Sequence, residues 1–355
     1  MFGGRGRGNQ PSGSHAASPS EPPHIVRIRD GRFRQVPFAE ALDISDVARR
    51  QKSLGRQLVA LRAFALLLVL AAVCVGGFPV VLQYQSQAKL AETSEQSESN
   101  VRGWPYPQAE LAFQAAQEYN RKLAQSGQPV MGEAVDPFTS VAGRSSASGS
   151  EDSAASKDTE YQELLDTGGG VMGSIVIPKV SIDLPIYHGT SESALASGSG
   201  HLYGSSLPVG GVDTHAVLTG HRGLVDALMF TRLDEMQVGD FFYIKVMGET
   251  LGYRVDRISV IEPDDTSQLK IVPGEDRVTL MTCTPYGVNT HRLLVSGVRQ
   301  TIPDPIPQIT DAPRDCRVWT IASVAIPLAL GLLLLWARHR PWRRMRHGGW
   351  WPRRL

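Results

Sequence analysis

Apolar residues form two unbroken stretches in this chain, residues 63–82 (AFALLLVLAAVCVGGFPVVL) and residues 318–337 (VWTIASVAIPLALGLLLLWA). A helix of about 20 residues is roughly 30 Å long, which matches the hydrocarbon core of a bilayer. The pattern therefore predicts two transmembrane helices. A cleaved signal peptide is the alternative for the first stretch. That stretch begins after a long polar segment, however, and it exceeds the roughly 7–15 apolar residues of a signal peptide.

Between these stretches the pattern changes twice. Apolar side chains four residues apart, at Leu111, Ala115, Tyr119 and Leu123, predict a helix over 108–125 that ends at Gly127. From 171 to 299, short runs of Val, Ile, Leu and Tyr alternate with Gly, Pro and Asp. Closely spaced strands with turn signals between them are typical of an all-β barrel or sandwich. We expect that fold there.

Charge is distributed unevenly, although the net charge is only +1. Residues 1–62 hold 11 Lys and Arg against 5 Asp and Glu, and residues 338–355 hold 7 against none. Basic flanks of a membrane span stay in the cytoplasm, so both termini are expected inside and the region between the spans outside the cell. Basic tails beside membrane spans also favour anionic lipid over nucleic acid as their partner.

The chain has three cysteines, too few for a disulfide framework. Cys74 lies within the first apolar stretch and Cys316 lies two residues before the second. Cys283 is thus the one cysteine of the expected β domain. A Cys283–Cys316 disulfide is one alternative, and a small buried apolar side chain is the ordinary role for a cysteine at the end of a strand.

The residues around Cys283 suggest that it is a catalytic nucleophile. In the expected strand 277–283 (RVTLMTC), Thr279, Met281 and Cys283 share one face. If the following strand, HRLLVSGVR, pairs with it, Arg292 comes close to Cys283 and favours the thiolate. His221, in the segment AVLTGHRG, is the candidate general acid and base. A thiolate, an imidazole and a fixed cation are suited to acyl transfer.

Each of these three residues is weak evidence by itself. His221 is one of nine histidines, and His188, His201, His215 and His291 lie in the same region. Arg292 could equally be a surface charge on an edge strand. Only the combination of a cysteine, a histidine and an arginine in one β domain indicates an enzyme.

At this point the chain resembles the sortase family. TLMTC matches the family's Thr-Leu-x-Thr-Cys signature, LTGHRG matches its histidine segment, and Arg292 stands where the family carries its arginine. The resemblance covers residues 171–299. It implies a closed β-barrel and a cysteine transpeptidase that cleaves a Leu-Pro-x-Thr-Gly-like (LPxTG-like) sorting signal. Cys283 would hold the acyl group as a thioester, His221 would act as general acid and base, and Arg292 would stabilise the oxyanion or the substrate.

The segment before the barrel resembles class C, the pilus-assembling sortases, in which an Asp-Pro-aromatic motif forms a lid. Here that motif is Asp136, Pro137 and Phe138. Proline stiffens the loop, the carboxylate is suited to pair with a cation such as Arg292, and the phenyl ring is suited to cover the thiol. An ordinary turn opened by Asp-Pro is the alternative for this motif. Two membrane spans also fit class C.

Together these features predict a two-pass protein of the cell membrane with an extracytoplasmic catalytic domain. The expected segments are a basic, partly disordered cytoplasmic tail (1–62), a transmembrane helix (63–82), a helical segment (83–130), a lid loop (131–141), a flexible linker (142–170), the catalytic barrel (171–303), a second linker (304–317), a second transmembrane helix (318–337) and a basic cytoplasmic tail (338–355).

The expected partners are sorting signals of surface proteins or pilins, an acceptor amine of a pilin lysine or a cell-wall precursor, and the lipid bilayer. We expect neither a cofactor nor a metal. Calcium at the acidic residues near 262–276 is less favoured than a solvated loop, because the closely spaced carboxylates of a calcium loop are absent from the sequence. A secreted cysteine hydrolase that uses the same residues and a non-catalytic β-barrel scaffold are the alternative functions.

Overall fold

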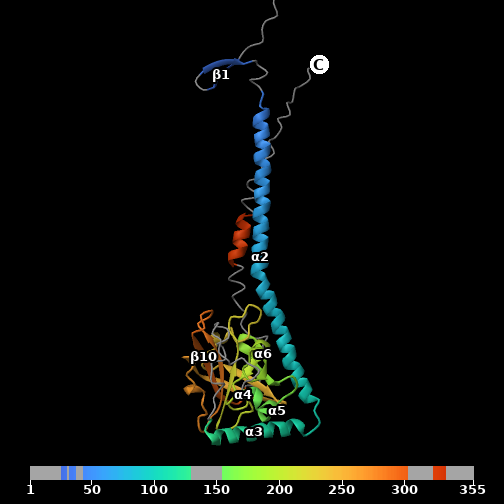
Figure 1. Ribbon diagram of the computed structural model, residues 1–355, viewed down its shortest axis with the longest axis vertical. Coiled ribbons are helices and arrows are strands. Elements are labelled where there is room, and N and C mark those ends of the chain that lie inside the picture. Colours follow the sequence, from blue (N-terminus) through green and yellow to red (C-terminus); the bar gives the residue numbers. More distant parts are fainter. Residues whose placement is uncertain (1–24, 30–31, 37–42, 129–153, 303–322, 333–355) are drawn as a thin grey trace, which may run out of the picture. The chain divides into compact units, whose positions relative to one another are not determined.

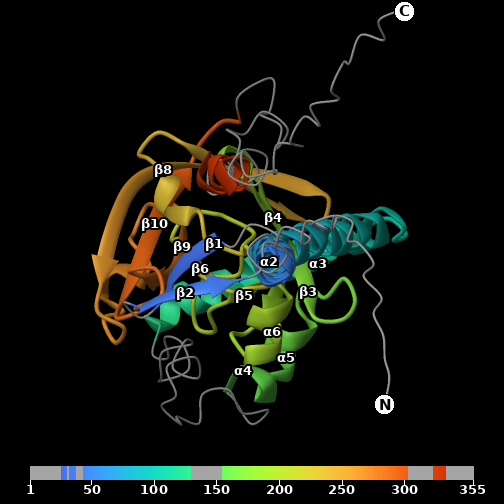
Figure 2. The same ribbon diagram turned by 90° about the horizontal axis from the view of Figure 1, so that it is seen from above.

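The computed structural model describes residues 25–29, 32–36, 43–128, 154–302 and 323–332 (Figures 1 and 2). The chain separates into two units, residues 72–332 and the remainder. In the smaller unit, β1 (Ile25–Arg29) and β2 (Arg32–Val36) form an antiparallel pair. This pair and the helix that begins at Ser45 show that part of the predicted disordered tail, 1–62, has regular secondary structure.

Eight strands of the larger unit close into a barrel in the order β10-β8-β7-β3-β4-β5-β6-β9. The closed barrel expected from the sequence is therefore confirmed. The strands are β3 (Val171–Ile177), β4 (Ile182–His188), β5 (Ser199–His201), β6 (Thr214–Thr219), β7 (Phe241–Val246), β8 (Glu249–Ile261), β9 (Asp276–Thr284) and β10 (His291–Arg299).

Alternation along the strands divides side chains between the barrel core and its outer face. On β9, Val278 and Leu280 belong to the main hydrophobic core, whereas Met281 and Cys283 belong to a second buried cluster. Successive side chains of a strand point to opposite sides, so the second cluster lies outside the barrel wall. This arrangement confirms the expected separation of the two faces of β9 and places Cys283 on the outer one.

Short helices and 3-10 turns connect and cover the strands. The predicted helix over 108–125 is observed as α3 (Gln108–Ser126), and Gly127 ends it in the left-handed conformation with φ 72°. The remaining short elements are α4 (Ala154–Lys157), α5 (Thr159–Glu163), α6 (Glu192–Ser197), η2 (Pro178–Val180), η3 (Leu233–Glu235) and η4 (Ser267–Leu269).

Part of the predicted flexible linker 142–170 has an ordered structure. Residues 154–170 include α4 and α5, and Tyr161 of α5 is fully buried. The hydroxyl of Tyr161 hydrogen-bonds His201 Nδ1 at 2.9 Å and accepts from the backbone N–H of Gly189 at 2.9 Å. One aromatic side chain thus fastens this segment to the barrel. The small polar residues around it did not indicate this contact.

The long helix α2 (Ser45–Arg102) contains the first predicted span, and among the described residues it is the helix long and apolar enough to cross a membrane. The second predicted span, 318–337, is described only over residues 323–332. These residues form an apolar helix, Ser323–Leu332, too short to cross a bilayer by itself. The remainder of that span and the tail 338–355 lie outside the described residues.

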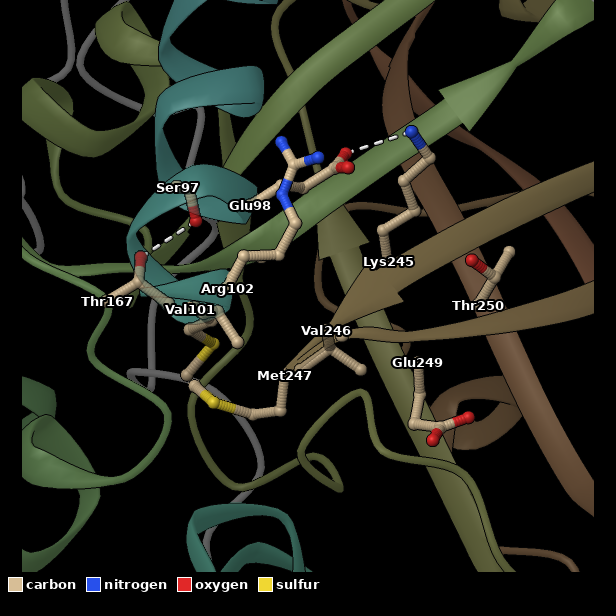
Figure 3. Close-up of a pocket in the computed structure, with 13 residues that line it drawn as sticks. Ser97, Glu98, Val101, Arg102, Thr167, Lys245, Val246, Met247, Glu249 and Thr250 are labelled. Carbon is tan, nitrogen blue, oxygen red and sulfur yellow. Dashed lines mark hydrogen bonds and ion pairs between the residues drawn. The ribbon is translucent and has the colours of Figure 1, made fainter. Parts of the chain in front are cut away.

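The last turns of α2 pack on the outer face of the barrel. Ser97 Oγ lies 2.8 Å from Thr167 Oγ1, and Lys245 Nζ donates to Glu98 Oε1 at 2.9 Å. Figure 3 shows these contacts around a cavity of ≈ 110 Å³ between the helix and the turn that joins β7 to β8. The contact is largely polar, with Leu90 and Val101 as its buried apolar residues on the helix.

Candidate active site

Cys283 and Arg292 are direct neighbours across two paired strands. β9 and β10 are antiparallel, and their register places Arg292 opposite Cys283. The turn between the strands contains Pro285, whose carbonyl accepts the backbone N–H of Val288 at 3.0 Å. The pairing expected from the sequence is confirmed, because this turn returns the chain directly beside β9.

His221 approaches the Cys283 end of β9 from β6, the neighbour on the side opposite to β10. β6 runs parallel to β9, with Thr219 beside Met281. The pairing continues past the strand, because Gly220 N–H donates to the carbonyl of Met281 at 3.1 Å and Thr282 Oγ1 donates to the carbonyl of Gly220 at 2.7 Å. His221 follows immediately. The three candidate residues therefore lie at one end of three adjacent strands, β6, β9 and β10.

A small apolar cluster surrounds the sulfur of Cys283 on the outer face. The cysteine is 3 % exposed. Its cluster consists of Leu195, Leu202, Val217, Ile261, Leu269, Met281 and Leu294. These apolar side chains keep water away from the thiol. The cluster lies outside the barrel core, so the burial of Cys283 does not separate it from the ends of the strands where His221 and Arg292 lie.

His221 lies in a loop that packs closely on the barrel end. Phe230 N–H donates to the His221 carbonyl at 3.0 Å, and a Cβ on Gly220 would approach the Phe230 ring within 2.8 Å. Glycine is therefore required at 220. Burial lowers the pKa of His221 below its usual 6.5, while the charge of Glu192 acts in the opposite direction. Burial thus favours the neutral form of the imidazole.

Arg292 is buried at the start of β10, with 3 % of its surface exposed. Its Nη1 donates to the carbonyls of Asn289 at 3.0 Å and His291 at 2.8 Å. Asn289 adopts a positive φ of 60°, which turns its carbonyl toward the guanidinium. These bonds to the turn fix the guanidinium beside the strand end that carries Cys283, so the surface-charge alternative for Arg292 is wrong.

Arg222 is a second buried cation that sequence reasoning missed. Its Nη1 lies 3.4 Å from the Cys283 carbonyl and 3.2 Å from Thr284 Oγ1, and its Nη2 donates to Asp234 Oδ2 at 2.5 Å. The side chain is 5 % exposed. Arg222 thus joins the histidine loop to the cysteine strand. The sequence signal that could have indicated Arg222 is its position directly after His221 in GHRG.

The competing histidines of the same region have structural partners. His201 Nε2 lies 2.8 Å from the Ser206 carbonyl, and His215 bonds the Lys270 carbonyl and Thr279 Oγ1, each at 2.7 Å. Burial lowers the pKa of each to about 4. His188 bonds two backbone carbonyls, and His291 pairs with Glu262 at 3.3 Å. These contacts connect loops and strands, which leaves His221 as the histidine beside Cys283.

The proposed lid residues Asp136, Pro137 and Phe138 lie outside the described residues, as does the rest of the lid loop 131–141. Cys316 also lies outside them. Among the described residues, no group of three or more His, Cys, Asp or Glu side chains is arranged to hold a metal ion.

Comparison with known proteins agrees with this geometry. The family model described as the sortase domain matches residues 175–300. Sortase D of Bacillus subtilis (strain 168) is 30% identical over 136 residues, which cover 38% of this chain and 66% of that protein. Sortase A of Staphylococcus aureus (strain NCTC 8325 / PS 47) is 31% identical over 144 residues, 38% of this chain and 68% of that protein. The match thus spans about two thirds of these two curated relatives.

A solved structure extends the likeness beyond the family domain. The crystal structure of sortase C from Streptococcus pneumoniae is 39% identical, with a TM-score of 0.50, and the match covers 61% of this chain and 100% of that one. The closed barrel, the cysteine at the end of β9 and the matched sequences lead to one conclusion. The chain belongs to the sortase family of cysteine transpeptidases.

Proposed function

We propose that this protein cleaves an LPxTG-like sorting signal through a thioester on Cys283 and transfers the acyl group to an amine. The observation that carries the proposal is the register that places Arg292 opposite Cys283, with His221 on the neighbouring strand end. A nucleophile, a general acid and base and a fixed positive charge then act on one carbonyl group.

The reaction follows from these positions. His221 takes the proton of the Cys283 thiol, and the resulting thiolate attacks the threonine carbonyl of the signal. The Arg292 guanidinium stabilises the negative oxygen of the tetrahedral intermediate. His221 donates a proton to the departing glycine amine as the carbon–nitrogen bond breaks, which leaves a thioester. An acceptor amine then attacks the thioester and gives its proton to His221. A new amide bond forms and the thiolate leaves.

We further propose that the protein is a class C sortase whose acceptor is a pilin lysine. The structure of the 39% identical neighbour gave insights into catalysis and pilin substrate specificity. A sortase C1 structure from Streptococcus agalactiae is 38% identical with a TM-score of 0.50. Those properties belong to the neighbours. Here they support the choice of a pilin lysine over a cell-wall precursor as the acceptor.

The proposed location is the cell membrane, with two spans, both termini in the cytoplasm and the barrel outside. The apolar stretch within α2 supports the first span. The apolar helix Ser323–Leu332 lies within the second proposed span, 318–337, and the basic residues that follow support a cytoplasmic C-terminus.

The proposed lid comprises Asp136, Pro137 and Phe138. Gln128, the last described residue before it, is anchored near the apolar cluster around Cys283. Gln128 Oε1 accepts the backbone N–H of Ile271 at 2.7 Å, and Gln128 Nε2 donates to the Gly204 carbonyl at 3.2 Å. These anchors support a loop that begins beside the site and covers the thiol.

The decisive experiment isolates the acyl-enzyme. The full-length protein in detergent is mixed with a sorting-signal peptide, and mass spectrometry is used to find the thioester on Cys283. The thioester is then offered either a pilin lysine or water. A transpeptidase transfers the acyl group to the amine faster than water releases it. Release by water alone, with the natural pilin present, would favour the secreted-hydrolase alternative, and a Cys283→Ala variant that keeps its cellular role would favour the scaffold.

A further inference from the structure

The catalytic end of the barrel is the end nearest to the apolar stretch of α2. At this end, Gln83 Nε2 of α2 donates to the carbonyl of Leu224, three residues after His221. The helix reaches the other end of the barrel about five turns later, where Asn100 Nδ2 donates to the carbonyl of Thr167, ahead of β3. Figure 1 shows this part of α2 beside the barrel. α2 thus runs from the catalytic end to the opposite end.

The contact at Gln83 sets the height of the catalytic end above a bilayer. Gln83 is the first residue after the predicted span 63–82. The interfacial layer of a bilayer is roughly 5–8 Å thick on each side of the hydrocarbon core, while one helical residue rises about 1.5 Å. The loop that Gln83 holds therefore lies at the level of the lipid headgroups when α2 spans the membrane.

Two loops at this end form one surface, which we call the mouth loops and define as residues 222–226 and 285–289. The guanidinium carbon of Arg222 lies 5.9 Å from the centre of the Tyr286 ring. Gly223 packs under the same ring, because a Cβ there would approach it within 3.3 Å. The mouth loops directly follow His221 and nearly adjoin Cys283, so they border the site.

The mouth loops expose apolar side chains to solvent. Val225 is 64% exposed, Tyr286 is 56% exposed and Val288 is 65% exposed. Of their two charged residues, Arg222 is buried and paired, which leaves Asp226. Exposed valine and tyrosine side chains on a surface at headgroup height have the composition of a segment that enters a membrane interface.

We propose that the mouth loops dock on the lipid surface of the membrane that α2 spans, so that the site of Cys283 opens onto the headgroup layer. The proposal rests on the membrane anchoring proposed above. The anchor already confines the barrel to the membrane, so a few apolar contacts that would bind a free protein weakly are sufficient here. A substrate anchored in the same bilayer is then cleaved beside the headgroups.

The depth of the mouth loops tests the proposal directly. Val225→Cys and Val288→Cys are each introduced into the full chain, with Cys74 and Cys316 replaced by Ser and Cys283 by Ala. Each variant is labelled with a nitrobenzoxadiazole fluorophore and reconstituted in phosphatidylcholine vesicles with or without nitroxide-labelled headgroups. Val212→Cys is the matched control, because Val212 is 71% exposed and lies before β6, at the opposite end of the barrel.

Headgroup nitroxides are expected to quench the labels at 225 and 288 at least about twofold more than the label at 212. A label at Leu70→Cys, within the predicted span, reports insertion of α2 through nitroxides on the acyl chains. Equal quenching at 225, 288 and 212 with Leu70 quenched would mean that the barrel stands clear of the lipid, which overturns the docking and leaves the anchor intact. An unquenched Leu70 label overturns both.

A second experiment separates docking on lipid from docking on another protein. Val225→Asp and Val288→Asp are combined in the chain that retains Cys283. Cleavage of a soluble signal peptide is expected to change by less than about twofold, whereas cleavage of the same signal carried on a membrane-spanning segment in vesicles falls about tenfold. Equal loss on both substrates, or loss on neither, contradicts the proposal. A loss that appears only when a partner protein is added assigns the surface to that protein.

Discussion

Cys283, near the end of β9, lies directly opposite Arg292, near the start of β10. The two residues are separated along the chain only by a short turn, and the antiparallel register brings their side chains to the same outer face of the barrel. His221, the proposed general acid and base, follows the end of the parallel strand β6, which is far away in sequence. Each of the predictions below tests one part of this site or of the contacts that hold it.

The planar guanidinium of Arg292 is held by two backbone carbonyls. We predict that Arg292→Lys lowers kcat/KM by about 10²-fold, because an ammonium cannot keep both bonds and also stabilise the oxyanion. Steady-state kinetics with a signal peptide measure the effect. Arg254 is an exposed cation on β8, so Arg254→Lys is the control, and its kcat/KM is expected to stay near the wild-type value. Full activity in Arg292→Lys would exclude the oxyanion role.

The charge of Glu192 raises the pKa of His221, against the dominant effect of burial. Glu192→Gln removes this charge, so we predict a further fall in the His221 pKa. The limb of the pH–rate profile that reports His221 should therefore move to lower pH. Glu163→Gln, also exposed on a short helix, is the control and should leave the limb in place. A shift to higher pH in Glu192→Gln would contradict the assignment.

The lid proposal concerns access to the thiol. Asp136→Ala removes the carboxylate proposed to pair with a cation, and Phe138→Ala removes the ring proposed to cover Cys283. Each variant is expected to react several times faster than wild type with a thiol reagent, measured in the full chain with Cys74 and Cys316 replaced by Ser. Ser145→Ala is the control. Unchanged labelling rates in both lid variants would remove the lid from the proposed function.

Asn120 joins α3 to the backbone of Leu207, in the segment between β5 and β6. Its Nδ2 donates to the Leu207 carbonyl at 3.0 Å, and its Oδ1 accepts the Leu207 N–H at 2.7 Å. Asn120→Ala leaves two buried backbone groups without partners, so we predict a loss of about 3 kcal/mol in the free energy of unfolding. Urea unfolding followed by circular dichroism measures it. The exposed Gln114→Ala should change stability by less than about 0.5 kcal/mol.

Two buried histidines make the barrel sensitive to acid. The folded-state pKa values of His201 and His215 are lowered to about 4 by burial, below the unfolded value of 6.5. The stability is therefore complete above pH 6.5 and declines as the pH falls toward 4, by about 3 kcal/mol for each histidine. Denaturation at several pH values checks this. His215→Asn should lower stability at pH 7 and also flatten the pH dependence.

Local patterns in the sequence determined much of this protein. The spacing of apolar residues predicted α3, Gly127 ended it, and alternation within 277–283 separated the face of Met281 and Cys283 from that of Val278 and Leu280. The pairing with Arg292 was accessible because a hairpin depends on neighbouring residues. The sequence also placed the apolar stretch of α2, since its length and composition are local properties.

The tertiary structure decided which distant groups meet. The parallel pairing of β6 with β9 brought His221, and not the competing histidines, to the end of the cysteine strand. The same pairing brought Arg222 Nη1 to 3.4 Å from the Cys283 carbonyl. The burial of Tyr161 ordered a segment that its composition suggested was flexible. The contact of Gln83 with Leu224 set which end of the barrel lies nearest the apolar stretch. Such contacts depend on strand order and burial across the whole fold, which local residue patterns do not encode.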